Sequence, residues 1–188
     1  MMQAAISSGV FLIDICFTLY ITLIMLRFLL QYIKADFYNP ICQFLMKATN
    51  PLLIPCRRII PGFFGFDCAA LVLIYILQLI EIVLKILLVY GSFALTPWMF
   101  LVGIVEIVIL LITIFIYAII IQAISSWFSQ PYAYNPMTTI LTQLTDPILR
   151  PFRRFFQTQS GMDFSPLVAI IILYAIKIFI MGLMPVNL

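Results

Sequence analysis

The sequence predicts an all-α membrane protein with four transmembrane helices, and three observations carry this prediction. Of its 188 residues, 65% are hydrophobic and 9% are charged, whereas soluble domains have about 45–50% and about 25%. The mean hydropathy is +1.20, and the apolar runs approach the roughly 20 residues that cross a bilayer as a helix. These runs are continuously apolar, whereas the strands of a membrane β-barrel alternate polar and apolar residues.

Four spans are expected, at residues 6–33, 68–90, 97–124 and 166–185. The short connection 91–96 has no charge, while the two other connections are long and contain clustered lysine and arginine. Loops rich in these residues stay in the cytoplasm, because translocating them across the membrane is disfavoured. We therefore expect both long loops in the cytoplasm and both termini on the outer, periplasmic side.

The two long loops carry the same motif. Residues 51–58, Pro-Leu-Leu-Ile-Pro-Cys-Arg-Arg, return ninety-six positions later as residues 147–154, Pro-Ile-Leu-Arg-Pro-Phe-Arg-Arg, and the match extends without a gap on both sides. It predicts two helix–loop–helix repeats of parallel orientation, residues 1–92 and residues 93–188. The shared loop framework consists of Asn39, Pro40, Pro51, Pro55, Gly65 and Asp67, then of Asn135, Pro136, Pro147, Pro151, Gly161 and Asp163.

Each loop is predicted to contain an amphipathic helix. Asn39-Pro40 and Asn135-Pro136 are typical of an N-cap followed by proline at the first helical position. Apolar residues then recur at the spacing of one helix face, which predicts a short helix of about ten residues. Two placements remain open: the apolar face lies in the membrane interface, or it packs on the spanning helices.

The chain is expected to turn after this helix. Pro55 and Pro151 each remove a backbone donor, so we expect them to end the helical segment. The returning spans then begin near Asp67 and near Asp163 or Ser165, which are natural N-cap residues.

Two adjacent arginines follow the prolines in each loop, Arg57-Arg58 and Arg153-Arg154. One interpretation is that they only fix the topology. Alternatively they bind anionic headgroups or an acidic partner, each contributing roughly 1 kcal/mol near an anionic surface. The two interpretations are compatible. The prolines that flank the arginines in both loops favour binding. Charge alone is enough to fix the topology, whereas rigid prolines would also orient the arginine side chains toward a ligand.

Ionisable residues within the spans form the second candidate site. A charge at the bilayer midplane costs about 2.5 to 3.5 kcal/mol, so pairing or local water is expected. Glu81 and Lys85 have the spacing of an ion pair along one helix, and Glu81 and Lys177 are repeat equivalents that could pair if their spans meet. Structural pairing and an ion or proton path both remain open. The cluster consists of Asp14, Glu81, Lys85, Glu106 and Lys177, all expected in the outer half of the membrane.

Three further polar residues within the spans have simpler interpretations. Arg27 is close enough to the end of its span to be interfacial, as is Asp14 at the other end. Gln78 and Gln122 are expected to form hydrogen bonds between helices rather than to bind a ligand.

Nothing in the sequence indicates catalysis. It has no histidine, and its four cysteines have no C-x-x-C spacing, so we interpret them as free thiols and expect no metal and no cofactor. It has no recognisable nucleophile with a base, so we expect no enzyme and assign no catalytic residue. The net charge of +3 is too small to suggest direct nucleic-acid binding.

The repeated motif resembles the YggT family of small bacterial membrane proteins, whose relatives in Gram-positive bacteria, cyanobacteria and plastids are called YlmG. The resemblance lies in residues 36–40, Asp-Phe-Tyr-Asn-Pro, the two Pro/Arg blocks, Gly65-x-Asp67, and residues 161–166, Gly-Met-Asp-Phe-Ser-Pro. It covers essentially the whole chain, although Tyr132-Ala133 replaces Asp36-Phe37 in the second copy. It implies a bacterial inner-membrane protein with links to osmotic or ion tolerance, cell division or nucleoid organisation, and plastid cytochrome assembly, but it implies no agreed activity.

These observations together lead us to expect a non-enzymatic membrane scaffold or assembly factor. Its Pro/Arg loops would contact anionic lipid or a cell-division or assembly protein, and its small size and polar cluster would suit a homo-oligomer. The alternative is a small ion-handling protein, a channel or a transport accessory, that uses the charge cluster within the spans.

Overall fold

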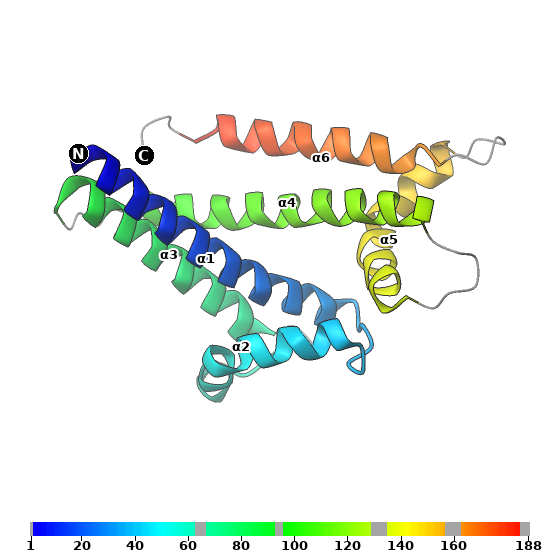
Figure 1. Ribbon diagram of the computed structural model, residues 1–188, viewed down its shortest axis with the longest axis horizontal. Coiled ribbons are helices and arrows are strands. Elements are labelled where there is room, and N and C mark those ends of the chain that lie inside the picture. Colours follow the sequence, from blue (N-terminus) through cyan, green and yellow to red (C-terminus); the bar gives the residue numbers. More distant parts are fainter. Residues whose placement is uncertain (1, 63–66, 93–95, 129–134, 157–162, 185–188) are drawn as a thin grey trace. The chain divides into compact units, whose positions relative to one another are not determined.

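The structure is a computed structural model that describes residues 2–62, 67–92, 96–128, 135–156 and 163–184. Its described residues form six α-helices and no strand, which confirms the all-α prediction (Figure 1). The helices are α1 (Met2–Tyr32), α2 (Pro40–Ile59), α3 (Cys68–Tyr90), α4 (Trp98–Phe128), α5 (Pro136–Phe156) and α6 (Ser165–Gly182).

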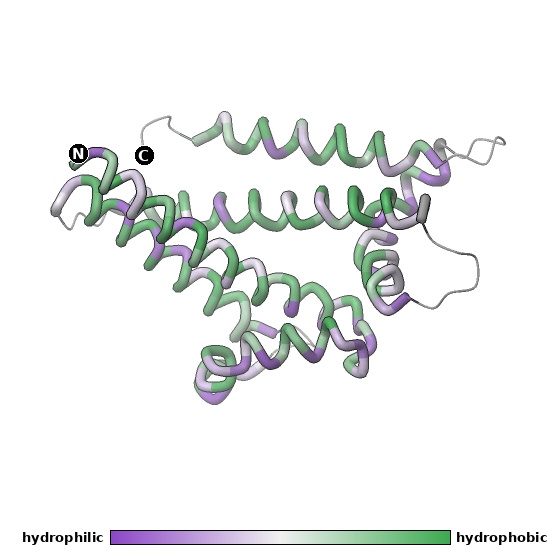
Figure 2. Tube along the Cα trace, viewed as in Figure 1, coloured by the Kyte–Doolittle hydropathy of each residue, from purple (hydrophilic) through white to green (hydrophobic). Residues whose placement is uncertain are grey.

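Four helices are long and apolar enough to cross a membrane: α1, α3, α4 over Trp98–Ser126, and α6. Figure 2 shows hydrophobic residues along most of their length, and more hydrophilic positions in α2 and α5. Large apolar side chains on the spanning helices are exposed, among them Phe179 at 69% and Phe11 at 60%. Such exposure is compatible with a multi-pass membrane protein, because lipid tails surround these side chains in a bilayer.

The chain divides into two compact units, Met1–Phe28 with Phe44–Val108, and Leu29–Gln43 with Ile109–Leu188. The boundaries between these units fall within α1, α2 and α4. The division into residues 1–92 and 93–188 is a statement about repeated sequence, and it stays a prediction.

In the first unit, α1 and α3 run in opposite directions (Figure 1). They approach closely at Gly9, where an added Cβ atom would lie 2.8 Å from a methyl carbon of Leu88. The first turns of α4 pack on α3 through Ile82, Met99 and Val102, all buried. The first long loop therefore joins an outgoing helix to a returning one, as predicted for each repeat.

In the second unit, the remainder of α4 packs with α5 and α6. Ile119, Leu149 and Ala169, one from each helix, are fully buried in a shared core. This core holds the apolar face of α5 against two apolar helices. The packing of α5 on the spanning helices is thus observed, and its placement in the membrane interface stays a prediction.

The prediction that Pro55 and Pro151 end the loop helices was wrong. The helices α2 and α5 have 20 and 21 residues and contain both prolines of their motif, so they are about twice the expected length. All four prolines lie at exposed positions, where the carbonyl groups left without a donor can be solvated. The chain does change direction within α2, as Figure 1 shows, but the helix continues through the bend.

The predicted N-caps of the loop helices are confirmed. The side-chain oxygen of Asn39 accepts from the amide of Ile41, and that of Asn135 accepts from the amide of Met137, each at 2.9 Å. Asn39 also donates to the carbonyl of Pro136 at 2.9 Å. The beginning of α2 is therefore tied to the beginning of α5 within the second unit.

The predicted caps of the returning spans are half correct. Asp67 is the N-cap of α3 and accepts from the amide of Ala70. In α6 the N-cap position is Phe164, so neither Asp163 nor Ser165 occupies it. The Asp163 carboxylate instead accepts from the amide of Ser165 at 2.9 Å, at the first residue of the helix.

Candidate functional site

The first basic cluster comprises Arg27, Lys47, Arg57, Arg58 and Asp67, all within the first compact unit. Arg57 forms an ion pair with Asp67, whose side chain is only 5% exposed. This contact joins the end of α2 to the beginning of α3. Arg58 is exposed and forms no ion pair within the described part of the chain. The two adjacent arginines therefore have different surroundings.

Arg27 has contacts that sequence reasoning missed, while its interfacial position stays a prediction. It is 8% exposed and donates from Nη1 to Thr49 Oγ1 at 2.6 Å and Asn50 Oδ1 at 2.8 Å. Its side chain holds α2 against α1. A lone arginine within an apolar run was the signal that could have predicted these contacts, because a buried guanidinium requires hydrogen-bond acceptors.

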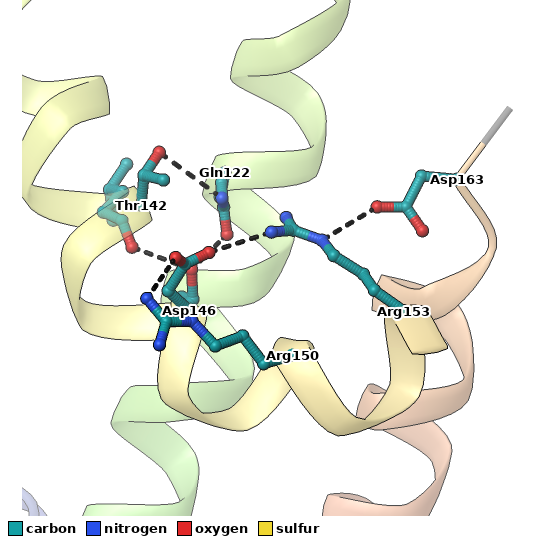
Figure 3. Close-up of polar contacts among 8 residues, drawn as sticks. Gln122, Thr142, Asp146, Arg150, Arg153 and Asp163 are labelled. Atoms are coloured by element: carbon teal, nitrogen blue, oxygen red, sulfur yellow. Dashed lines mark hydrogen bonds and ion pairs between the residues drawn. The ribbon is translucent and has the colours of Figure 1, made fainter. Parts of the chain in front are cut away.

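The second basic cluster comprises Asp146, Arg150, Arg153, Arg154 and Asp163, all within the second compact unit. Arg153 donates from Nη1 to Asp146 at 2.8 Å and from Nε to Asp163 at 3.2 Å, as Figure 3 shows. Arg150 lies 3.6 Å from Asp146. Arg154 is exposed and forms no ion pair with any described residue. As in the first cluster, one arginine of the pair is held and the next is exposed.

In the second unit, Gln122 contacts the buried threonine of the loop helix, as Arg27 does in the first unit. Its side-chain amide donates to Thr142 at 3.4 Å (Figure 3), and its oxygen accepts from Thr145, which is fully buried. The predicted role of Gln122 as a hydrogen-bond partner between helices is confirmed. Thr49 and Thr145 are repeat equivalents, and both are fully buried.

Asp163 has a pKa below its ordinary value. Burial acts to raise this pKa, but hydrogen bonding from Ser165 and the nearby Arg153 guanidinium together outweigh it. The carboxylate is thus charged at neutral pH. The contact between Arg153 and Asp163 is therefore an ion pair under physiological conditions.

The third candidate site lies between α1, α3 and α4 of the first unit. Lys85 Nζ is 2.5 Å from both Asp14 Oδ1 and Glu81 Oε1. The Gln78 amide donates to Glu81 at 3.2 Å and to Glu106 at 2.6 Å. The predicted pair of Glu81 and Lys85 and the predicted inter-helix role of Gln78 are confirmed. One amide and one ammonium group thus connect three carboxyl groups.

Lys177 is half-buried on α6, in the other compact unit. Its proposed pairing with Glu81 stays a prediction. Two members of the predicted loop framework, Gly65 and Gly161, lie outside the described residues.

The side chains at these sites offer charge and hydrogen bonds. The four cysteines are free thiols, as expected, and the pKa of Cys42 is raised by burial and, secondarily, by Asp36. In the described part of the chain, no group of three or more candidate ligands could hold a metal ion. Guanidinium groups are suited to binding phosphate or carboxylate.

Comparisons with known proteins identify the family. The CCB3/YggT family model matches residues 6–88 and 101–184. The chain is 38% identical to an uncharacterized protein of Pseudomonas aeruginosa, over 94% of this chain and 89% of that protein. It is 34% identical to the uncharacterized protein YggT of Escherichia coli K12, over 89% and 86% of the two chains. No solved structure matches. The chain therefore belongs to the CCB3/YggT family.

Proposed function

We propose that this protein acts without chemistry as a membrane scaffold or assembly factor, and that its two basic clusters are the contact surface. One observation carries the proposal. In each loop the first arginine of the pair is held by the aspartate ten residues later, while Arg58 and Arg154 are exposed. A cationic side chain on a braced helix can contact anionic lipid headgroups or an acidic partner repeatedly in the same orientation.

The location of the clusters also belongs to this proposal. Basic residues are gathered in the two long loops, which favours a cytoplasmic position for both in a bacterial inner membrane. There the clusters would face the anionic leaflet and cytoplasmic proteins. A role in cell division or in tolerance of osmotic stress is consistent with this location.

The experiment compares two variants in a deletion strain. Arg58→Gln with Arg154→Gln removes the exposed arginines, whereas Lys34→Glu lowers the net charge by the same two units at an exposed loop position outside both clusters. We expect the first variant to lose its captured partner and its complementation in native membranes, while the second retains most of both. Equal retention by the two variants, at equal protein levels and preserved topology, would count against the scaffold.

The second candidate function is ion handling, and it is favoured by the cluster around Lys85. Three carboxyl groups and one ammonium group lie together within the spanning helices. Unpaired carboxylates are costly in hydrocarbon, so such clusters often mark ion or proton pathways. Purified protein in liposomes should then support a flux that Glu106→Gln reduces. Unchanged fluxes from the intact protein would exclude this alternative.

A further inference from the structure

One difference between the two basic clusters lies at the equivalent positions 50 and 146. Asn50 and Asp146 are ninety-six residues apart, and each precedes the first proline of its motif. Each side chain accepts a hydrogen bond from an arginine, Asn50 from Arg27 and Asp146 from Arg153. One acceptor is neutral and the other is charged.

The second cluster is largely neutralised by its own carboxylates. Asp146 lies between Arg150 and Arg153, and Arg153 also reaches Asp163 (Figure 3). Its three arginines and two aspartates give a formal charge of +1. An external anion therefore has little unmet charge to bind there.

The first cluster has less compensation, because Asp67 is its single carboxylate and pairs with Arg57. None of the described carboxylates forms an ion pair with Arg27, which is buried beside the neutral Asn50. Four cationic side chains and the single carboxylate of Asp67 give a formal charge of +3. A buried guanidinium that is not ion-paired is costly. The cluster is thus suited to binding an anion that the chain does not supply.

The surroundings of the first cluster indicate what kind of anion this is. Lys47, Pro51, Pro55 and Arg58 are exposed, and their spacing of four, four and three residues is that of one helix face. Exposed apolar side chains accompany them, including Ile59 at 82%. The helix α2 connects two helices that are long and apolar enough to cross a membrane, so this mixed surface is suited to the level where headgroups and acyl chains meet.

We propose that the first basic cluster binds the phosphate group of an anionic phospholipid, which supplies there the negative charge that Asp146 supplies in the second cluster. The inference rests on the proposed function and deepens it, because it names the ligand and assigns it to one of the two loops. Arg57 and Arg58 face the headgroup, and Arg27 contributes its charge from behind α2. The second loop is left with a weaker preference for anionic lipid.

The test exchanges the two acceptors. Asn50→Asp places a carboxylate 2.8 Å from Arg27 and should weaken binding of phosphatidylglycerol about fivefold, the effect of one unit charge at an anionic surface. Asp146→Asn should strengthen it. Gln43→Glu adds the same charge to α2 seven residues before Asn50 and should change binding less than twofold. Native mass spectrometry of the detergent-purified full chain counts the bound lipid, with phosphatidylcholine as the neutral reference.

Each result decides. If Asn50→Asp and Gln43→Glu weaken binding equally, only net charge matters and the assignment to the first cluster is overturned. If inorganic phosphate displaces the lipid at equal concentration, the ligand is a soluble anion and not a headgroup. If Arg58→Gln with Arg154→Gln abolishes lipid binding while Asn50→Asp leaves it unchanged, this inference fails and the proposed function stands. If none of these variants alters lipid binding, this inference fails, and so does the proposal that the basic clusters contact anionic lipid.

Discussion

The Arg57 guanidinium pairs with the Asp67 carboxylate across the connection between α2 and α3. Ninety-six positions later, Arg153 pairs with Asp163 in the same way between α5 and α6. Asp67 is also the N-cap of α3. Its carboxylate therefore both caps the beginning of this span and holds the end of the loop helix α2 beside it. The repeated sequence therefore encodes a repeated contact.

Asp67→Asn should destabilise the protein more than Asp163→Asn. The Asp67 side chain is 5% exposed and Asp163 is 47% exposed, so the first loses a buried charged hydrogen bond worth about 1.5 to 3 kcal/mol. The second loses a surface ion pair worth about 0.2 to 1 kcal/mol. Unfolding of each variant by SDS in detergent micelles measures the difference. Equal losses would show that burial of Asp67 does not strengthen its contacts.

The contribution of Asp163 should depend on pH in a defined direction. Its pKa is lower in the folded protein than in the unfolded chain, whose aspartate pKa is about 3.9. The ion pair thus stabilises the fold above about pH 4, and this stabilisation is lost as the pH falls through the folded-state value. The stability difference between the wild type and Asp163→Asn should shrink in that range. A difference independent of pH would contradict the assignment.

Lys85→Met should be among the most damaging single changes within the spans. It leaves Glu81, whose side chain is 3% exposed, without its cation, and breaking a buried pair costs about 3 to 5 kcal/mol. The double variant Glu81→Gln with Lys85→Met should recover part of that loss, because no unpaired charge remains. A double-mutant cycle on SDS unfolding measures the coupling, and additive losses would mean that the two groups do not interact.

Arg27→Lys should loosen α2 although it conserves the charge. Both hydrogen bonds come from Nη1, and a lysine ammonium ends one bond short of that nitrogen, so it cannot keep both contacts in the same packing; the lost hydrogen bonds are worth about 1.5 to 3 kcal/mol. Hydrogen exchange of the amides of α2 should increase. Arg58→Lys, at an exposed position of the same helix, is the matched control and should leave exchange unchanged. Equal exchange in the two variants would show that the Arg27 side chain does not hold α2 against α1.

The side of the membrane on which the loops lie can be read from Cys56. A variant that retains only this partly exposed thiol should resist an impermeant maleimide in intact cells and react once the inner membrane is permeabilised. A variant that retains only Cys42, which is buried and has a raised pKa, should react slowly even then, and faster as the pH rises. Labelling of Cys56 in intact cells would place the loop on the outer side.

Much of the local structure could be predicted without coordinates. The spans follow from the length of the apolar runs, and Asn39, Asn135 and Asp67 cap their helices as their residue types indicate. The prolines misled the prediction because their effect depends on burial. A missing donor ends a helix in an apolar environment, but here the unpaired carbonyl groups are at exposed positions.

The sequence by itself determined the four apolar spans, the two copies of one basic motif and the helix caps, because these depend on residues that are close together in the chain. Only the tertiary structure decided which arginine of each pair is held, that Arg27 reaches Asn50, and that Gln78 bridges Glu81 and Glu106. The reason is physical: a charge in an apolar environment binds whichever partner packing brings within reach, and no local pattern in the sequence records that distance.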